Sequence, residues 1–444
     1  MPEVTLTQVL QAREKRVLTQ QAMLHAHRCP LICFTMNIAG PVKTSPLIER
    51  GFRAGLEALE EALAQVRIRE RCLEIEPTGC QAMLAVEWDA ARLKDLCTAI
   101  EDRSPLGRLF DMDVLDTDGR KLTRATQRGC IVCGAPGRAC AAGRLHRVDQ
   151  LQTATHRILR EHFARADSAR IASAAVQSLI DEVHTTPKPG LVDRRNSGSH
   201  TDMDISTFLA SAKALEPYFQ ECVQIGQDTA TLPPEQTFPP LRRAGLRAEQ
   251  DMYRATGGVN THKGAIYTMG ILCGSLGRLW TPESPIPKPE DIFVECGKIA
   301  KSAAVDDLAG ADGSTAGLRL YLTHGLTGIR GEAAAGLPSV RKIGLPAYED
   351  ALHKGLNPND AGAVALLHLI ARVKDTNLYR RGGSDGAAYA AGAAGSLLLR
   401  DPFPSMEQLA KLDDAFIARN LSPGGCADLL AATYFLHGLT LLGD

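Results

Sequence analysis

The chain has 444 residues, enough for two or three domains, and its 44% hydrophobic and 23% charged content excludes a disordered protein. Its 50 basic and 51 acidic side chains leave a net charge of −1, which excludes a strongly basic nucleic-acid-binding protein. No apolar run reaches the roughly 18 residues of a membrane span, and the N-terminus shows no secretion signal. We therefore expect a cytoplasmic protein with reduced cysteines and with no nucleic-acid or membrane partner.

Cysteine and glycine are distributed unequally along the chain. Eight of the twelve cysteines lie in the first 140 residues, whereas thirty of the forty glycines lie after residue 150. Two compositions in one chain predict two domains, at 1–155 and 165–444. We predict that the first is an α+β, nucleotidyltransferase-like module and that the second is an all-α helical domain.

The first module alternates helical and strand patterns. Short β-branched and aromatic runs, bounded by glycine and proline, favour strands, whereas a capping residue before an apolar periodicity favours a helix. In chain order we predict a helix over 5–27, a strand over 30–38, a helix over 47–66, strands over 71–76 and 82–88, a helix over 90–101 and a strand over 109–115.

The second module shows helical periodicity almost throughout. Apolar residues recur at spacings of three and four, as on the buried face of a helix. The predicted helices cover 168–183, 205–223, 241–253, 265–279, 289–305, 360–373, 386–399 and 405–418.

A pair of acidic residues lies on the last predicted strand of the first module. Asp111 and Asp113 share one face of this strand, because side chains alternate along a strand. Mg²⁺ prefers carboxylate ligands and bridges them to substrate phosphates, so the pair predicts a Mg²⁺ site, unless it is a solvated acidic face. Nearby basic residues favour phosphate binding, namely Lys43, Arg108 and Arg124.

Three cysteines and a histidine follow the acidic pair. Cys130, Cys133, Cys140 and His146 match a Cys₃His zinc site in ligand type, although their spacing is shorter than in common zinc fingers. Alternatively, they are reduced cysteines packed in a small core. The sequence leaves both interpretations open.

Dense polar segments interrupt the helices of the second module. Each lies at the end of a predicted helix, where backbone N–H groups favour anions. If these ends converge on one cleft, they supply side chains for phosphate binding at Lys188, Asn196, His200, Asn260, His262, Lys263, Arg330, Asn377 and Arg381. Asp193, Glu332 and Asp375 are the candidates for acid/base or metal-binding roles.

These segments resemble those of a known family. TPKPGLVD, NSG-x-H-x-DM, GVNTHKGAI, GLTGIRGEA, DTNL-x-x-RGG and SPGG-x-ADLLAAT occur in this order over 168–444, as in the triphosphoribosyl-dephospho-CoA synthase family. Residues 8–150 resemble the apo-citrate lyase phosphoribosyl-dephospho-CoA transferase family, through residues 32–43, SPLI-x-RGF, the D-x-D strand and the cysteine motif. The chain departs from the second family at Ala142 and Gly143, where the family has arginine and serine.

The resemblance implies a bifunctional transferase. The second module would join ATP to 3'-dephospho-CoA with loss of adenine. The first would transfer phosphoribosyl-dephospho-CoA to a serine of the citrate lyase acyl-carrier (gamma) subunit, with release of diphosphate. Asp111 and Asp113 would then hold Mg²⁺, and Lys43, Arg108 and Arg124 would bind phosphate.

Two other functions remain open from the residues alone. The helical module is also compatible with a metal-dependent nucleotide hydrolase fused to a nucleotidyltransferase. The first module is also compatible with a zinc-stabilised domain that docks the carrier subunit without catalysis.

Overall fold

A computed structural model of the chain describes residues 3–310, 312–313 and 316–442. The chain divides into two compact units, Met1–Arg165 and Ala166–Asp444, and each is described by itself. Helix α5, Val148–His184, begins in the first unit and continues into the second.

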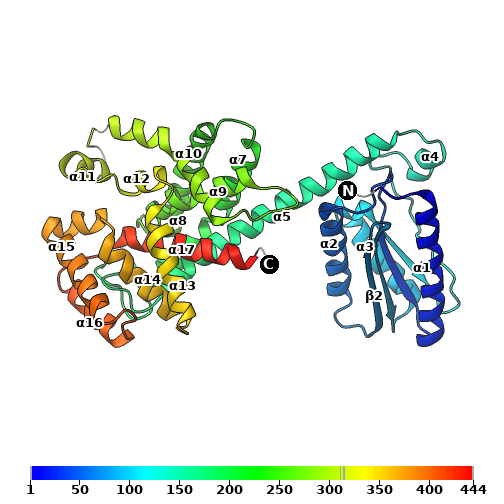
Figure 1. Ribbon diagram of the computed structural model, residues 1–444, viewed down its shortest axis with the longest axis horizontal. Coiled ribbons are helices and arrows are strands. Elements are labelled where there is room, and N and C mark those ends of the chain that lie inside the picture. The colour runs from blue at the N-terminus through cyan, green and yellow to red at the C-terminus, as the bar shows by residue number, and fades with distance from the viewer. Residues whose placement is uncertain (1–2, 311, 314–315, 443–444) are drawn as a thin grey trace. The chain divides into compact units, whose positions relative to one another are not determined.

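The first unit is built on a four-stranded antiparallel sheet with the strand order β2-β3-β1-β4. Helix α1 covers one face of the sheet, and α2 and α3 cover the other (Figure 1). Phe34 of β1 points to the second face, where its ring stacks on Phe52 of α2 with 4.8 Å between centroids. The neighbouring Cys33 points to the α1 face, where its Sγ accepts a hydrogen bond from Gln20.

The elements of this unit agree with the predicted order and begin at capping residues. Ser45 accepts the N–H of Ile48 and precedes Pro46 at the first turn of α2, and Asp89 caps α3 in the same way. The elements are α1 Leu6–His27, β1 Leu31–Met36, α2 Pro46–Ala62, β2 Ile68–Glu76, β3 Gly79–Val86, α3 Ala90–Asp102, η1 Leu106–Leu109, β4 Phe110–Leu115 and α4 Gly137–Ala142.

The described part of the second unit is helical, as predicted. Its core is centred on α9, Lys263–Leu279. Helix α9 packs closely on α7, Glu216–Asp228, because Gly277 has no side chain; a Cβ there would lie 2.0 Å from the Val223 carbonyl oxygen. The elements after α5 are α6 Ile205–Ala214, α7 Glu216–Asp228, η2 Pro234–Thr237, α8 Phe238–Ala255, α9 Lys263–Leu279, α10 Pro289–Ala309, α11 Ala316–His324, α12 Gly328–Ala334, η3 Val340–Gly344, α13 Leu345–His353, α14 Pro358–Arg372, α15 Thr376–Arg400, α16 Met406–Ile417 and α17 Gly424–Leu442.

Three predicted helix boundaries were wrong. The helix expected to start at residue 168 already begins at Val148. The single helix expected over 205–223 is divided at Leu215, where Pro217 starts the first turn of a new helix and cannot lie inside an existing one. The helix expected to start at residue 386 is already present from Thr376, with a break at Gly383, whose φ of 65° and ψ of −165° are not helical.

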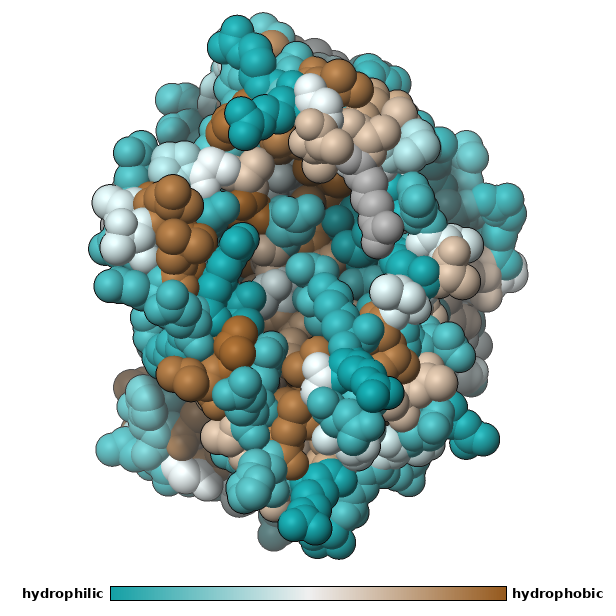
Figure 2. All heavy atoms as spheres, turned by 90° about the vertical axis from the view of Figure 1, so that its right-hand side faces the viewer, coloured by the Kyte–Doolittle hydropathy of each residue, from teal (hydrophilic) through white to brown (hydrophobic). Residues whose placement is uncertain are grey.

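The face of the molecule in Figure 2 is mostly hydrophilic, and its hydrophobic residues lie in small separate groups. Within the described residues, we find no helix whose length and hydropathy would suit a membrane crossing.

Candidate active sites

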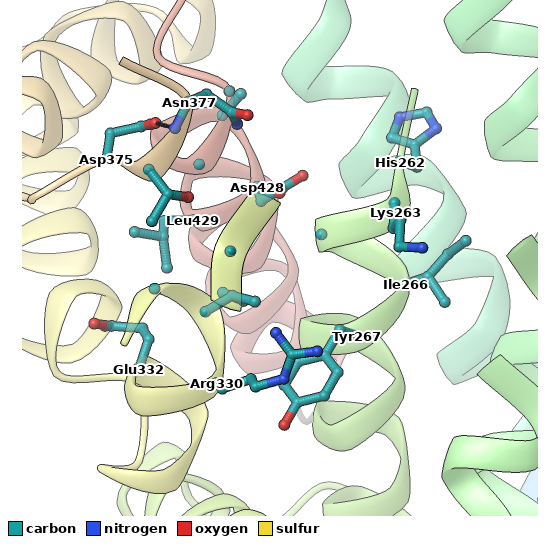
Figure 3. A pocket seen from close by; sticks show the side chains of 18 of the residues that line it. His262, Lys263, Ile266, Tyr267, Arg330, Glu332, Asp375, Asn377, Asp428 and Leu429 are labelled. Atoms are coloured by element: carbon teal, nitrogen blue, oxygen red, sulfur yellow. Dashed lines mark hydrogen bonds between the residues drawn. The ribbon is translucent and has the colours of Figure 1, made fainter. Parts of the chain in front are cut away.

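A cavity of about 990 Å³ lies within the second unit, where several helix ends meet. Figure 3 shows side chains from α9, α12, α15 and α17 around it, including Lys263, Glu332, Asp375 and Asp428. Most of the polar residues predicted for this unit line the cavity, namely Lys188, His200, Asn260, His262, Lys263, Arg330, Glu332, Asp375, Asn377 and Arg381.

Asp428 of α17 lies against the start of α9. The Ala265 N–H hydrogen-bonds to the Asp428 carboxylate, and a Cβ at Gly264 would lie 1.9 Å from its Oδ2. Burial, followed by the nearby Glu182 and Asp375 carboxylates, raises the pKa of Asp428 well above its usual value. The raised pKa and the position in the cavity make Asp428 the carboxyl group to test as a proton donor.

Two predicted carboxylates also line the cavity. Asp375 caps α15 and accepts the N–H groups of Asn377 at 2.7 Å, Leu378 at 3.2 Å and Cys426 at 2.8 Å. Glu332 accepts the N–H of Ser339 at 2.6 Å. Burial raises the pKa of both carboxyl groups. Asp375 is the more constrained of the two, because three backbone donors fix it.

Three of the four predicted cations of the cavity have acidic partners, whereas Arg381 donates to the Ser199 carbonyl and to Oδ1 of Asn420. Lys188, which is 1% exposed, forms an ion pair with Glu182 at 2.5 Å between Nζ and Oε1. Lys263 pairs with Glu249 at 2.6 Å. Arg330 pairs with Asp307 at 3.1 Å. Lys263 is half exposed and Arg330 about a quarter exposed, so these two can reach a ligand, whereas Lys188 is enclosed.

Two histidines of the cavity are held neutral. Burial, followed by the positive charge of Arg381, lowers the pKa of His200 to about 4. Burial lowers the pKa of His262 to about 3, and its Nδ1 lies 2.7 Å from the Ser211 hydroxyl. Nε2 of His262 is buried without a hydrogen-bond partner among the described residues. At neutral pH both imidazoles act as uncharged hydrogen-bonding groups.

Two residues predicted for this site do not line the cavity. The Asp193 carboxylate accepts the N–H groups of Lys188, Arg195 and Asn196 at 2.7–3.1 Å, which shapes the loop after α5. Asn196 donates from Nδ2 to Asp413 at 2.8 Å and accepts the N–H of Gly198 through Oδ1. Both side chains are engaged in holding the loop.

Sequence reasoning missed several residues that line the cavity, namely Glu182, Glu249, Tyr267 and Asp428. A signal for Glu182 was available, since it lies three residues after Leu179 on the apolar stripe of its helix, where an acid needs a partner. Asp428 stands alone in the apolar stretch of α17, a helix that was not predicted. Glu249 lies on a predicted helix and gave no comparable signal.

The first unit places the acidic pair as predicted. Asp111 and Asp113 of β4 pair with Thr35 and Cys33 of β1, on the sheet face covered by α1, while Met112 is buried on the opposite face. Partial desolvation, followed by the Asp113 carboxylate, raises the pKa of Asp111. Asp113 binds Lys121 at 2.5 Å. Within the described residues the Asp111 carboxylate has no hydrogen-bond or ion-pair partner, so it is available to a cation.

The basic residues predicted beside this pair point elsewhere. Lys43 donates to the Ile38 carbonyl at 2.5 Å, Arg108 donates to the Gly129 carbonyl, and Arg124 pairs with Asp102 and Glu101. The cations whose charges act on Asp111 are instead Arg16, Lys94, Lys121 and Arg128. Arg16 comes from α1, far away in the sequence, so no local motif indicated it.

The four predicted zinc ligands converge. One ligand atom from each of Cys130, Cys133, Cys140 and His146 lies within 4.8 Å of the others. Among the described residues, no other group of three or more His, Cys, Asp or Glu side chains lies close enough together to hold a metal ion.

Comparison with known families assigns both units. Residues 168–443 match the family described as ATP:dephospho-CoA triphosphoribosyl transferase. Residues 4–162 match the apo-citrate lyase phosphoribosyl-dephospho-CoA transferase family. The first match covers more than half of the chain, and the chain belongs to the ATP:dephospho-CoA triphosphoribosyl transferase family, with a phosphoribosyl-dephospho-CoA transferase domain in front. The resemblance seen in the sequence is thereby confirmed.

One relative matches both units, and two others match about 60% of the chain. Protein CitXG of Haemophilus influenzae is 36% identical over 98% of this chain and 96% of its own length. The 2-(5''-triphosphoribosyl)-3'-dephosphocoenzyme-A synthase of Pectobacterium atrosepticum is 41% identical and covers 63% of this chain. A probable synthase of the same description from Vibrio cholerae is 42% identical over 61% of this chain.

Proposed function

We propose that this chain makes and attaches the prosthetic group of citrate lyase in two steps. The second unit joins ATP to 3'-dephospho-CoA, releases adenine and keeps the triphosphate on the product. The first unit transfers phosphoribosyl-dephospho-CoA to a serine of the acyl-carrier subunit and releases diphosphate. The family that each unit matches supports the reaction assigned to that unit. A cytoplasmic location is part of the same proposal.

The observation that carries the first step is the protonatable carboxyl group of Asp428 in the cavity. The 2'-hydroxyl of dephospho-CoA attacks the anomeric carbon of the ATP ribose, and the bond to adenine breaks. Adenine needs a proton as it leaves, and a carboxyl with a raised pKa can supply it. We therefore assign this proton to Asp428.

The hydroxyl proton needs a second carboxylate. Asp193 and Asp375 each accept three backbone N–H groups, whereas Glu332 accepts one backbone N–H, that of Ser339. We assign the hydroxyl proton to Glu332 for this reason. The carboxylates around the cavity also favour the positive charge that develops on the ribose.

The triphosphate is bound but not cleaved in this step. We place it at Lys263 and Arg330, which project from the starts of α9 and α12 with half or a quarter of their side chains exposed. The phosphates compete there with Glu249 and Asp307. The uncharged His262 is available to hydrogen-bond the sugar or base through its free Nε2.

The second step is an attack of the carrier serine on phosphorus, with diphosphate as the leaving group. Asp111 and Asp113 fit Mg²⁺ in donor type, since two carboxylates share one sheet face and one of them has no protein partner. When bound, Mg²⁺ neutralises charge on the departing diphosphate. The chain itself supplies Lys121 and Arg128 beside the pair. This nucleotidyltransferase-like chemistry is part of the proposal.

Adenine release from ATP tests the first step. The full chain should release adenine from ATP only when dephospho-CoA is present, as measured by chromatography. Asp428→Asn should lower this rate about 100-fold or more, because it removes the proton donor and keeps the side-chain shape. Asp385→Asn, an exposed residue of α15 outside the cavity, should keep the normal rate. Free ribose triphosphate formed without dephospho-CoA would instead indicate a hydrolase.

Labelling of the carrier tests the second step separately. Asp111→Asn should abolish labelling of the acyl-carrier subunit while adenine release continues. Asp95→Asn, an exposed residue of α3, is the matched control and should label normally. Normal labelling by Asp111→Asn would contradict the proposed metal-binding role and would favour a docking domain.

A further inference from the structure

The segment 121–153 of the first unit has almost no hydrophobic core. Among its described side chains only Cys140 is buried, while Leu145 is 65% exposed and Val148 is 49% exposed. Burial of apolar surface therefore cannot account for its fold. Small segments of this kind usually depend on a disulfide or a metal ion.

The backbone presents two of the cysteines on a tight turn. The Cys130 N–H donates to the Ala135 carbonyl at 2.6 Å, and the Gly134 N–H donates to the Cys130 carbonyl at 2.9 Å. The Val132 N–H donates to the Cys130 sulfur at 3.4 Å, which fixes the position of this sulfur on the turn. Cys140 follows on the short helix α4, and His146 lies just after it.

The spacing of the side chains matches one tetrahedral ion. The Cys133 and Cys140 sulfurs are 3.6 Å apart, and His146 Nε2 lies 3.3 Å from the Cys133 sulfur. Zn–S bonds of about 2.3 Å and Zn–N bonds of about 2.0 Å give tetrahedral edges of about 3.8 Å between sulfurs and about 3.5 Å from sulfur to nitrogen. These two separations are within a few tenths of an ångström of the tetrahedral edges, and all four ligand atoms lie within 4.8 Å of one another.

We propose that Cys130, Cys133, Cys140 and His146 bind one Zn²⁺ ion as a structural site. Three thiolates and a neutral imidazole complete the tetrahedron, so the ion has no open position for substrate or water. Binding of the ion supplies the folding free energy that apolar burial does not supply in this segment.

The segment also holds the start of the D-x-D strand. Arg128 donates to the Phe110 carbonyl and pairs with Glu101 at 2.8 Å, and the Gly129 carbonyl accepts the Arg108 guanidinium. Phe110 directly precedes Asp111. Loss of the ion should therefore loosen the contacts that hold the start of this strand, next to the acidic pair, while both carboxylates of the pair stay in the chain.

Metal analysis of the full chain tests the proposal. Chain purified without chelators or a histidine tag should contain one zinc per molecule, and cobalt substitution should give the visible spectrum of tetrahedral thiolate coordination. Cys133→Ser should lose the metal and should become sensitive to proteolysis within 121–153. Cys72→Ser, a partly buried cysteine outside the cluster, should keep both the metal and the protease resistance.

Several results would overturn the proposal. One is a wild-type chain that takes up no stoichiometric zinc or cobalt on reconstitution. Another is a Cys133→Ser variant that holds as much metal as Cys72→Ser. A disulfide between Cys133 and Cys140 in the folded chain, detected by mass spectrometry without reductant, would also overturn it. The stoichiometry and the cobalt spectrum of the wild-type chain require no variant, so a variant that unfolds leaves the test intact.

Discussion

The buried ion pair between Lys188 and Glu182 allows a quantitative test of the cavity's electrostatics. Both residues are nearly inaccessible, at 1% and 4% exposure, and their charged atoms lie 2.5 Å apart. Lys188→Met removes the positive charge and keeps the length of the side chain. It leaves the Glu182 carboxylate uncompensated, close to the Asp428 carboxylate, which lines the same cavity. Breaking a buried pair in this way costs about 3–5 kcal/mol of stability.

The partner variant separates the charge from the packing. Replacing both members by apolar residues, as in Glu182→Leu with Lys188→Met, is often neutral or stabilising. We therefore expect the double variant to recover most of the loss. Lys411→Met is the control, because it breaks an exposed pair with Glu407 in the same unit and should leave the stability almost unchanged.

Tryptophan fluorescence follows the second unit by itself. The chain has two tryptophans, and Trp280 is the one in this unit, where it is 5% exposed and donates to Asp167 at 2.7 Å. Urea unfolding in a Trp88→Phe background then gives the free energy of unfolding for each variant. A free energy of unfolding for Lys188→Met within about 1 kcal/mol of the parent value would contradict a buried pair, because so small a loss is expected only of an exposed one. A double variant no more stable than Lys188→Met would contradict it as well.

Three further predictions concern single residues. Gly264→Ala places a Cβ against the Asp428 carboxylate, so adenine release should fall at least tenfold, whereas Gly395→Ala, with open space around it, should leave the rate unchanged; equal rates would contradict the packing. The lowered pKa of His262 means that the unfolded chain gains a proton below about pH 6.5 while the folded chain stays neutral until about pH 3. The free energy of unfolding should therefore fall by about 2 kcal/mol more between pH 7 and 5 in the parent than in His262→Gln, as measured by urea unfolding, and equal slopes would refute the assignment. Glu101→Gln removes the negative charge that accepts the Met112 N–H and pairs with Arg128. It should destabilise the first unit by about 1.5–3 kcal/mol, as measured by Trp88 fluorescence during urea unfolding. A loss below about 0.5 kcal/mol would contradict a supporting role of this carboxylate.

The sequence predicted the first unit well because its signals are local. Ser45 and Asp89 mark helix starts, and the alternation around Asp111 and Asp113 marks a strand with one buried face. The cysteine motif also comes together as its ligand types indicated. The pairing order of the strands and the position of α1 over the acidic pair depend on distant contacts, such as that of Arg16 with Gln81, and no short segment encodes them.

In the second unit, sequence reasoning found helix ends but not their full arrangement. The polar segments around Lys263, Arg330 and Asp375 were recognised because they interrupt apolar periodicity, and all three residues line one cavity. Asp428 was missed because α17 is apolar on most sides, so it shows little helical periodicity. The role of Asp193 in holding a loop became visible only with its three backbone donors in place.

The pairing of charges could not be predicted either. Arg124 looked like a phosphate ligand by its position after the D-x-D strand, but its partners Asp102 and Glu101 come from the end of α3. An arginine that is held by two carboxylates is not available to bind a substrate phosphate. Spacing in the sequence identifies cations near a site, whereas the fold decides which of them remain available.

The most direct test of the two-step function is the intact mass of the citrate lyase acyl-carrier subunit after incubation with the full chain, ATP, dephospho-CoA and Mg²⁺. The mass should increase by one phosphoribosyl-dephospho-CoA group, and omission of either nucleotide should abolish the increase. A folded chain that leaves the carrier mass unchanged with all substrates present, or that modifies it without dephospho-CoA, would contradict the proposed function.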